Sequence, residues 1–379
     1  MSKTLQIIIG IIVVIIIISL IFVFSGEKKI ERETIKIGAI LSMTGDLAKY
    51  GEGVKNGINM AIEDFNTERG TDLIIELIIE DDLSCKVKEA VTATKKLITV
   101  DKVDFIVGPM CSAAAVAAAP IAEENITIMI SPSASTPDLS GSGRFIFRTY
   151  PSDRLKSIET VKFVATTLGF KKIALLTDIA NDSFVQQRED IKDVAQEFSV
   201  DIVAEESFRT KDTDFKTQLT KIKASRAEVI IFAAWAKETG LFLRQAEELD
   251  INIPFVSSDV MVEDPDVIEI AGKAADGVIY AYPVEPTNPE YKNFIEKYKN
   301  KFGQEPPAFA AEAYDATILA LKAIDSSDGS RESMRNQLYK VGQNYMGASG
   351  VITFDENGDV IKPILFKTIK NGQFVPYSE

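Results

Sequence analysis

The stretch that decides the fold runs from Phe105 to Ser140 and reads FIVGPMCSAAAVAAAPIAEENITIMISPSASTPDLS. It holds two short apolar segments, 105–108 and 127–130, and each runs into a turn of small and hydroxyl-bearing residues. The two segments predict neighbouring strands of one α/β sheet, whose carboxyl ends meet at one edge. Open α/β sheets bind ligands at that edge, and a helix N-terminus there offers unpaired N–H groups to an anion. We therefore predict half of an anion-binding site in this stretch.

Length and composition bound the class of protein. The chain has 379 residues, which is enough for two domains, and a net charge of -14. Such an acidic chain is a poor partner for nucleic acid or for anionic membrane surfaces. It contains no histidine, so the usual general base and the usual zinc ligand are both missing. We expect no enzymatic activity, no metal site and no cofactor.

The N-terminus predicts a membrane segment over residues 1–25. Residues 5–24 are almost wholly apolar, and as a helix they would span about 30 Å, the thickness of the hydrocarbon core. This run is longer than the apolar region of a signal peptide, which favours an uncleaved anchor followed by a charged tether over 26–34. Cleavage near Val23 and Ser25 remains the alternative, and it would give a secreted or periplasmic protein. Either way, we expect the rest of the chain outside the cytoplasm.

The chain has two cysteines, Cys85 and Cys111. In a cytosolic protein two free thiols would be the better interpretation, whereas outside the cytoplasm a disulfide is favoured. The membrane segment therefore favours a disulfide.

The rest of the chain repeats an α/β rhythm. Apolar strands alternate with amphipathic helices on both sides of Pro151, which predicts two doubly wound lobes. Near the C-terminus, segments 350–354 and 361–367 read as two strands joined by a turn. Residues Pro151, Pro283 and Gly347 mark plausible crossovers. The expected boundaries are 35–150 and 283–347 for lobe 1, and 151–282 and 348–379 for lobe 2.

Several stretches carry a family resemblance when taken in order. They are IKIGAILSMTGDLAKYGEGVKNGINMAIEDFN from residue 35, VGPMCSAAA, ISPSASTPDLS, KKIALLTDIANDSF, FKTQLTKIKASRAEVIIFAAWAKETGLFLRQA, PFVSSDV and PAFAAEAYDATILAL. With them, the chain from Ile35 to Lys367 resembles the type I periplasmic-type solute-binding proteins, specifically the branched-chain or hydrophobic amino-acid receptors of ABC transporters. The resemblance implies two Rossmann-like lobes joined by three hinge crossovers, which close around a ligand. It also implies a disulfide between Cys85 and Cys111.

The same resemblance assigns polar roles around a bound amino acid. It implies that Ser112 binds the carboxylate and that the carbonyl of Ser133 meets the ammonium. Ser135 would offer its hydroxyl to the ammonium and its N–H to the carboxylate. From the other lobe, Asp259 would take the ammonium. Two of these residues depart from the family pattern, because alanine is usual at Ser133 and glutamate is common at Asp259.

The resemblance also implies aromatic residues that line the ligand pocket. Tyr50 and Trp235 match family aromatics, Phe184 stands where a tyrosine is usual, and Phe309 resembles an aromatic near the side-chain pocket. Each of these residues also has a plainer interpretation as ordinary core, just as Ser112 and Asp259 could simply cap helices.

The sequence thus predicts a non-enzymatic extracytoplasmic receptor, tethered by its N-terminal segment and monomeric. It would capture a branched-chain or other hydrophobic amino acid and deliver it to ABC transporter permease subunits. One alternative keeps the fold and changes the ligand to an amide, a urea or an aromatic acid. Another makes the protein a ligand sensor.

Overall fold

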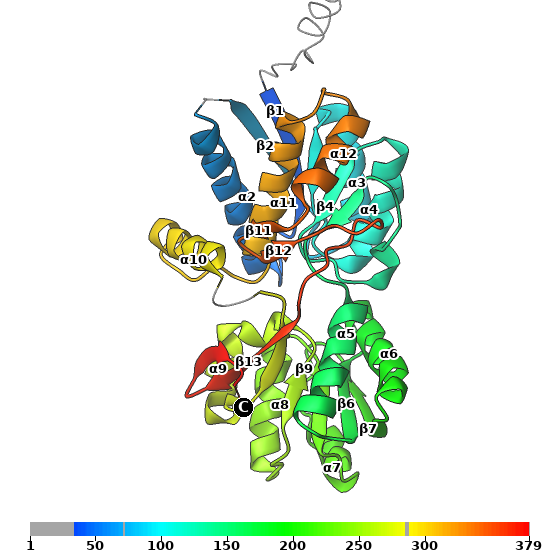
Figure 1. Ribbon diagram of the computed structural model, residues 1–379. Coiled ribbons are helices and arrows are strands. Elements are labelled where there is room, and N and C mark those ends of the chain that lie inside the picture. The colour runs from blue at the N-terminus through cyan, green and yellow to red at the C-terminus, as the bar shows by residue number, and fades with distance from the viewer. Residues whose placement is uncertain (1–33, 71–72, 285–287, 379) are drawn as a thin grey trace, which may run out of the picture.

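Two β-sheets, each covered by helices on both faces, make two lobes that Figure 1 shows one above the other. The computed structural model describes residues 34–70, 73–284 and 288–378. The predicted membrane segment, 1–25, therefore lies outside the described residues, as does nearly all of the tether. Within the described ranges, none of the helices has the length and apolar character needed to cross a membrane.

Lobe 1 is built on a five-stranded parallel sheet in the order β2-β1-β3-β4-β5. Its central strands are buried on both faces, as expected where helices cover both sides. The strands are β1 (Thr34–Leu41), β2 (Ile74–Asp81), β3 (Phe105–Val107), β4 (Ile128–Ser131) and β5 (Ile146–Arg148).

In the described residues, six helices belong to lobe 1, and three of them come from the late part of the chain. Helix α11 lies directly against α2, since Gly57 has no Cβ to collide with the carbonyl oxygen of Ala310. The helices are α2 (Ala48–Arg69), α3 (Val87–Lys96), α4 (Ser112–Glu124), α10 (Pro289–Phe302), α11 (Ala310–Asp325) and α12 (Arg331–Val341), with short turns η1 (Leu97–Asp101) and η2 (Pro137–Leu139).

Lobe 2 is built on a seven-stranded sheet in the order β14-β13-β10-β9-β8-β6-β7. Its strands β6 to β10 are parallel, and β13 and β14 add an antiparallel edge. The strands are β6 (Lys172–Asp178), β7 (Asp201–Phe208), β8 (Val229–Ala233), β9 (Phe255–Ser257), β10 (Ile279–Tyr282), β13 (Leu365–Lys370) and β14 (Gln373–Pro376). The helices are α5 (Asp153–Lys162), α6 (Asp182–Glu197), α7 (Lys216–Ala224), α8 (Ala236–Glu248) and α9 (Pro265–Ala271), with η3 (Phe163–Thr167), η4 (Val260–Glu263) and η5 (Gly272–Ala275).

The chain passes between the lobes three times. The first passage follows β5, the second follows β10, and the third runs from Val360 to β13. Three connections of this kind allow two lobes to rotate as rigid bodies about a shared hinge.

The third passage lies further along the chain than the sequence predicted. Residues 348–360, expected in lobe 2, lie against lobe 1. The backbone N–H of Ser349 donates to Asp315 of α11 over 2.6 Å, and Arg148 N–H donates to the carbonyl of Gly358 over 3.0 Å.

The hairpin predicted near the C-terminus forms only beside its turn, where Phe354 pairs with Val360 in antiparallel fashion and the N–H of Ile361 donates to the carbonyl of Thr353 over 2.9 Å. Beyond the turn, the two segments do not pair with each other. Residues 350–352 form β12, which pairs with β11 (Tyr345–Gly347), while β13 pairs with β10 of lobe 2. A turn signal reports only local geometry. Here the partners of the two strands are fixed by the passage of the chain from one lobe to the other.

Candidate functional site

The opening stretch folds as the sequence predicts. Strands β3 and β4 pair in parallel, with Phe105 opposite Ile128, so their carboxyl ends lie side by side. Gly108 ends β3 with a φ of 106°, and a Cβ at this position would lie 2.4 Å from the carbonyl oxygen of Ile40. Only glycine fits this turn, which brings the chain from β3 to the start of α4.

Three predicted serines gather at this edge. The hydroxyl oxygen of Ser112, the first residue of α4, accepts the N–H groups of Ser135 and Thr136, each over 3.3 Å. Ser133 donates its hydroxyl to the carbonyl of Met110 over 2.7 Å. Within the described part of the chain, the O–H of Ser112 has no acceptor, so it is available to a ligand oxygen.

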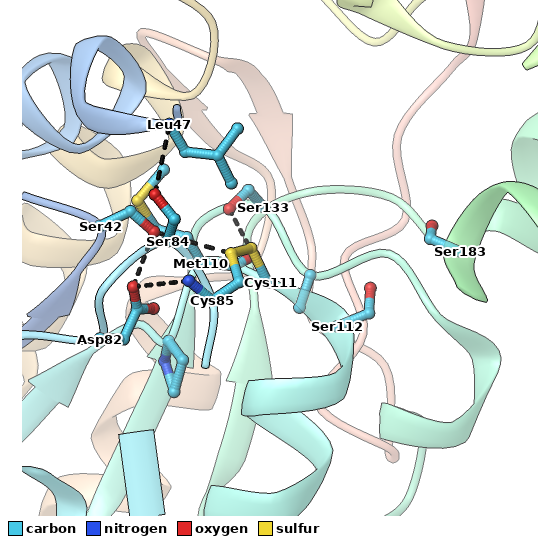
Figure 2. Close-up of a disulfide and its surroundings, with 12 residues drawn as sticks. Ser42, Leu47, Asp82, Ser84, Cys85, Met110, Cys111, Ser112, Ser133 and Ser183 are labelled. Carbon is cyan, nitrogen blue, oxygen red and sulfur yellow. Dashed lines mark hydrogen bonds between the residues drawn. A yellow bond between two sulfur atoms is a disulfide. The ribbon is translucent and has the colours of Figure 1, made fainter. Parts of the chain in front are cut away.

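A disulfide stabilises this carboxyl edge of the lobe 1 sheet. Cys85 and Cys111 are bonded with their Cα atoms 5.7 Å apart, which ties the loop after β2 to the residue before Ser112 (Figure 2). The carboxylate of Asp82 supports the loop by accepting from the hydroxyl of Ser42 at 2.7 Å and from the N–H of Cys85 at 2.9 Å. The cross-link and this buried acceptor restrict the position of Ser112.

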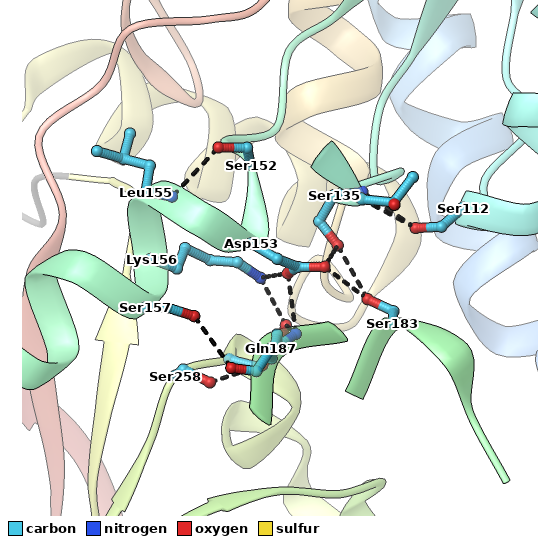
Figure 3. Close-up of polar contacts among 12 residues, drawn as sticks. Ser112, Ser135, Ser152, Asp153, Leu155, Lys156, Ser157, Ser183, Gln187 and Ser258 are labelled. Carbon is cyan, nitrogen blue, oxygen red and sulfur yellow. Dashed lines mark hydrogen bonds and ion pairs between the residues drawn. The ribbon is translucent and has the colours of Figure 1, made fainter. Parts of the chain in front are cut away.

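Opposite this edge, a buried cluster of three charged side chains lies at the first turn of α5. The Lys156 ammonium lies 3.0 Å from Asp153 Oδ1 and 2.7 Å from Asp259 Oδ2, and no part of its side chain is exposed (Figure 3). Burial alone would lower the pKa of Lys156, but the carboxylates of Asp259 and Asp153 outweigh burial and hold this pKa well above its ordinary value. Lys156 is therefore charged.

Gln187 of α6 joins the two acids. Its side-chain N–H donates to Asp153 Oδ1 over 2.9 Å and to Asp259 Oδ2 over 3.2 Å, while its carbonyl accepts from Ser258 over 2.6 Å. Asp259 itself stands at the N-terminus of η4, where Oδ1 accepts the N–H of Met261 over a long 3.4 Å.

The two lobes meet directly at this point. Ser135 of lobe 1 donates its hydroxyl to Asp153 Oδ2 over 2.9 Å, and Ser183 of α6 donates to the same oxygen over 2.7 Å. Figure 3 shows both hydroxyls converging on Asp153. The Ser135 hydroxyl, expected to meet a ligand ammonium, here bonds the opposite lobe.

The predicted aromatics form two separate groups. Phe184 and Trp235 of lobe 2 pack edge to face, with ring centroids 5.3 Å apart. In lobe 1, Phe309 lies between Tyr50 and Tyr150, at 6.3 and 5.3 Å from their ring centroids.

Tyr50 reaches across the molecule to lobe 2. Its hydroxyl donates to Asp264 Oδ2 over 2.6 Å, and Lys49 lies 2.5 Å from the same oxygen. Burial and the Asp264 charge raise the pKa of Tyr50 above its ordinary range, so the phenol stays protonated and donates. Tyr50 thus bridges the lobes as well as bordering Phe309.

Sequence reasoning missed Asp153, Lys156 and Gln187. One signal was present: the buried face of α5 carries Asp153, Lys156, Ser157 and Thr160, where a covering helix normally presents apolar residues. An acid and a lysine three positions apart share one helix face. That pattern indicates a buried polar cluster, although not its partner Asp259.

Known proteins resemble the chain over most of its length. Residues 34–373 match the model of a family described as periplasmic binding protein. A "Leucine-, isoleucine-, valine-, threonine-, and alanine-binding protein" of Pseudomonas aeruginosa is 30% identical over 339 residues, which cover 88% of this chain and 89% of the relative.

Two solved structures show the same fold. The leucine binding protein LivK of Thermotoga maritima is 31% identical with a TM-score of 0.80, and the match covers 91% of this chain and 98% of that one. The substrate binding protein LivJ of Streptococcus pneumoniae, solved in complex with isoleucine, is 28% identical with a TM-score of 0.78, covering 90% and 97%.

Proposed function

Because the chain belongs to the periplasmic binding protein family, we propose that it captures an amino acid between its lobes and delivers it to the permease of an ABC transporter. The proposed ligands are branched-chain amino acids or others with a hydrophobic side chain. Binding and release are proposed to leave the ligand chemically unchanged.

The proposal rests on one observation: the two sides of the lobe junction carry complementary polar groups, one suited to an anion and the other to a cation. On lobe 1, the free O–H of Ser112 lies at the N-terminus of α4, where unpaired N–H groups favour a carboxylate. On lobe 2, the carboxylate of Asp259 favours an ammonium. A zwitterion that contacts both sides bridges the lobes, which is a physical reason for them to close around it.

The nearby aromatics support a hydrophobic side chain. The Phe184–Trp235 pair of lobe 2 and the Phe309–Tyr150 pair of lobe 1 offer apolar surface on either side of the junction. The Pseudomonas and Thermotoga relatives are named as binding proteins for leucine and similar amino acids, and the Streptococcus relative was solved with isoleucine, which supports this ligand class.

The location follows from the same proposal. A receptor that feeds a permease works outside the cytoplasm, and the apolar N-terminal segment, 5–24, would tether it to the membrane as an uncleaved anchor. The receptor is proposed to act as a monomer.

Calorimetry with a panel of amino acids tests the proposal, using protein purified without denaturation and stripped of ligand. We expect saturable binding of leucine, isoleucine or valine. Replacing Asp259 by alanine should weaken it about tenfold or more, since a charge-assisted hydrogen bond would be lost. Failure of every amino acid to bind, or equal binding by the Asp259→Ala variant, would contradict the proposal. Mass spectrometry of ligand released from freshly purified protein identifies the natural solute.

A further inference from the structure

The buried charged cluster of lobe 2 has an unusual composition for a binding surface. It contains two acids, Asp153 and Asp259, and a single cation, Lys156, all almost completely buried. Two carboxylates in one desolvated place repel each other and resist ionisation unless a cation balances them. Lys156 balances one of the two, and one negative charge is left over.

The remaining acceptor capacity lies on Asp259. Asp153 accepts at both oxygens: Lys156 and Gln187 donate to Oδ1, and two serine hydroxyls donate to Oδ2. Asp259 accepts two donors at Oδ2, whereas from the described part of the chain Oδ1 receives only the 3.4 Å backbone contact from Met261. A further donor is therefore accommodated best at Asp259 Oδ1.

A buried hydroxyl without a hydrogen-bond partner in the described part of the chain lies near the same cluster. Tyr150 lies at the first passage between the lobes and is only 1% exposed, yet among the residues that the structure describes its hydroxyl has no hydrogen-bond partner. The Lys156 ammonium lies 4.7 Å from the centroid of its ring, and the charges of Asp259, Asp153 and Glu312 act on the same phenol. An orphaned hydroxyl is expensive to bury unless something satisfies it when the site is in use.

We propose that Lys156 sets the net charge of the cluster that receives the ligand ammonium. The junction then selects ligands with one ammonium group and an uncharged side chain. The proposal rests on the proposed function and narrows its ligand class. A single ammonium at Asp259 Oδ1 brings the cluster to neutrality. A ligand without an ammonium leaves a buried negative charge, and a ligand with a second cationic group adds an unmatched positive one.

The number of protons released when the ligand binds tests this role of Lys156. Leucine is titrated by calorimetry near pH 7 into the wild type and into Lys156→Met, in buffers of different ionisation enthalpy. Without Lys156, one of the two adjacent acids should take up a proton in the free protein, and the ligand ammonium should expel it. We therefore expect Lys156→Met to release about one proton more per leucine than the wild type. Glu312 and Tyr150 are present in both proteins, so their contribution cancels in the difference.

Two further variants separate charge from packing. The double variant Asp153→Asn/Lys156→Met again carries one negative charge, and its proton release should return to the wild-type value. Asp153→Asn alone makes the cluster neutral and should weaken leucine about tenfold. Lys162→Met, an exposed lysine of the same helix, is the matched control and should change neither quantity.

The outcomes also separate this proposal from the proposed function. Leucine binding with equal proton release by the wild type and Lys156→Met would overturn the role of Lys156 and leave amino-acid capture intact. So would a wild type that binds 4-methylpentanoate, which is leucine without its ammonium, as tightly as leucine. If no amino acid binds the wild type, the proposed function fails, and the role of Lys156 fails with it.

Discussion

The junction between the lobes has a buried part and an exposed rim, and the two are built differently. In the buried part, Ser135 donates to Asp153, which pairs with Lys156, and neither of these two ionic side chains is exposed at all. At the rim, Asp46 of lobe 1 pairs with Lys211 of lobe 2, and their side chains are 80% and 76% exposed. Water can replace the partner of a rim charge but not that of a buried one. The buried contacts therefore fix geometry, whereas the rim contacts let the lobes separate at little cost.

The largest expected effect comes from breaking the buried part. Lys156→Met leaves Asp153 and Asp259 side by side without their cation, and it should lower the free energy of unfolding by about 3–5 kcal/mol. Urea denaturation measures the change. The control Lys162→Met removes an exposed lysine from the same helix and should change stability by less than about 0.5 kcal/mol. Similar losses in the two variants would show that burial does not distinguish these lysines.

Glu312 is a second buried acid, and in the described residues no cation lies within ion-pair distance of it. Glu312, in the first turn of α11, is buried, and no side chain in the described ranges donates to its carboxylate. Burial raises the pKa of Glu312 to about 7, although Lys362 partly offsets burial; Asp315 and Glu263 act in the same direction as burial.

The sign of the resulting pH dependence follows from this raised pKa. The folded protein holds the Glu312 proton more tightly than the unfolded chain does, so the stability it contributes is complete below about pH 4.5 and is lost as the pH rises through 7. Between about pH 5 and pH 8, the wild type should lose roughly 2–3 kcal/mol more than Glu312→Gln. Denaturation at the two pH values measures the difference, and parallel pH profiles for the two proteins would contradict it.

Tyr50 lies between the buried part and the rim, so an intermediate effect is expected. Its hydroxyl donates across the lobes to Asp264, which keeps Lys49 as a partner when the hydroxyl is removed. Tyr50→Phe should disfavour the closed arrangement by about 1–2 kcal/mol. Small-angle X-ray scattering of the ligand-free variant should show a larger radius of gyration. The control is Tyr339→Phe, because that hydroxyl bonds Glu356 within lobe 1; an equal change in both variants would argue against a bridging role.

The sequence could predict contacts between neighbouring strands, because parallel strands in succession bring their ends together. Ser112 and Ser135 meet for that reason. The disulfide between Cys85 and Cys111 follows instead from the family resemblance and the expected compartment, since β1 lies between the strands β2 and β3 that precede the two cysteines. The sequence could not predict that Lys156 meets Asp259. That contact depends on how α5 rotates and on where the loop after β9 ends, and both are fixed by packing throughout lobe 2. Residues 348–360 were misplaced for a related reason, since hydrophobic pattern shows where a strand is but not which sheet it joins.

The smallest effect is expected at the rim. Lys211 and Asp46 lie 3.1 Å apart, but both side chains remain hydrated, and ordering two flexible chains offsets most of their attraction. Lys211→Met should change the free energy of unfolding by less than about 0.5 kcal/mol and should leave the scattering profile unchanged. What it can change is the salt dependence of lobe closure, because exposed charges are screened by added salt while buried ones are not. A loss approaching that of Lys156→Met would show that the rim, and not the buried cluster, holds the lobes together.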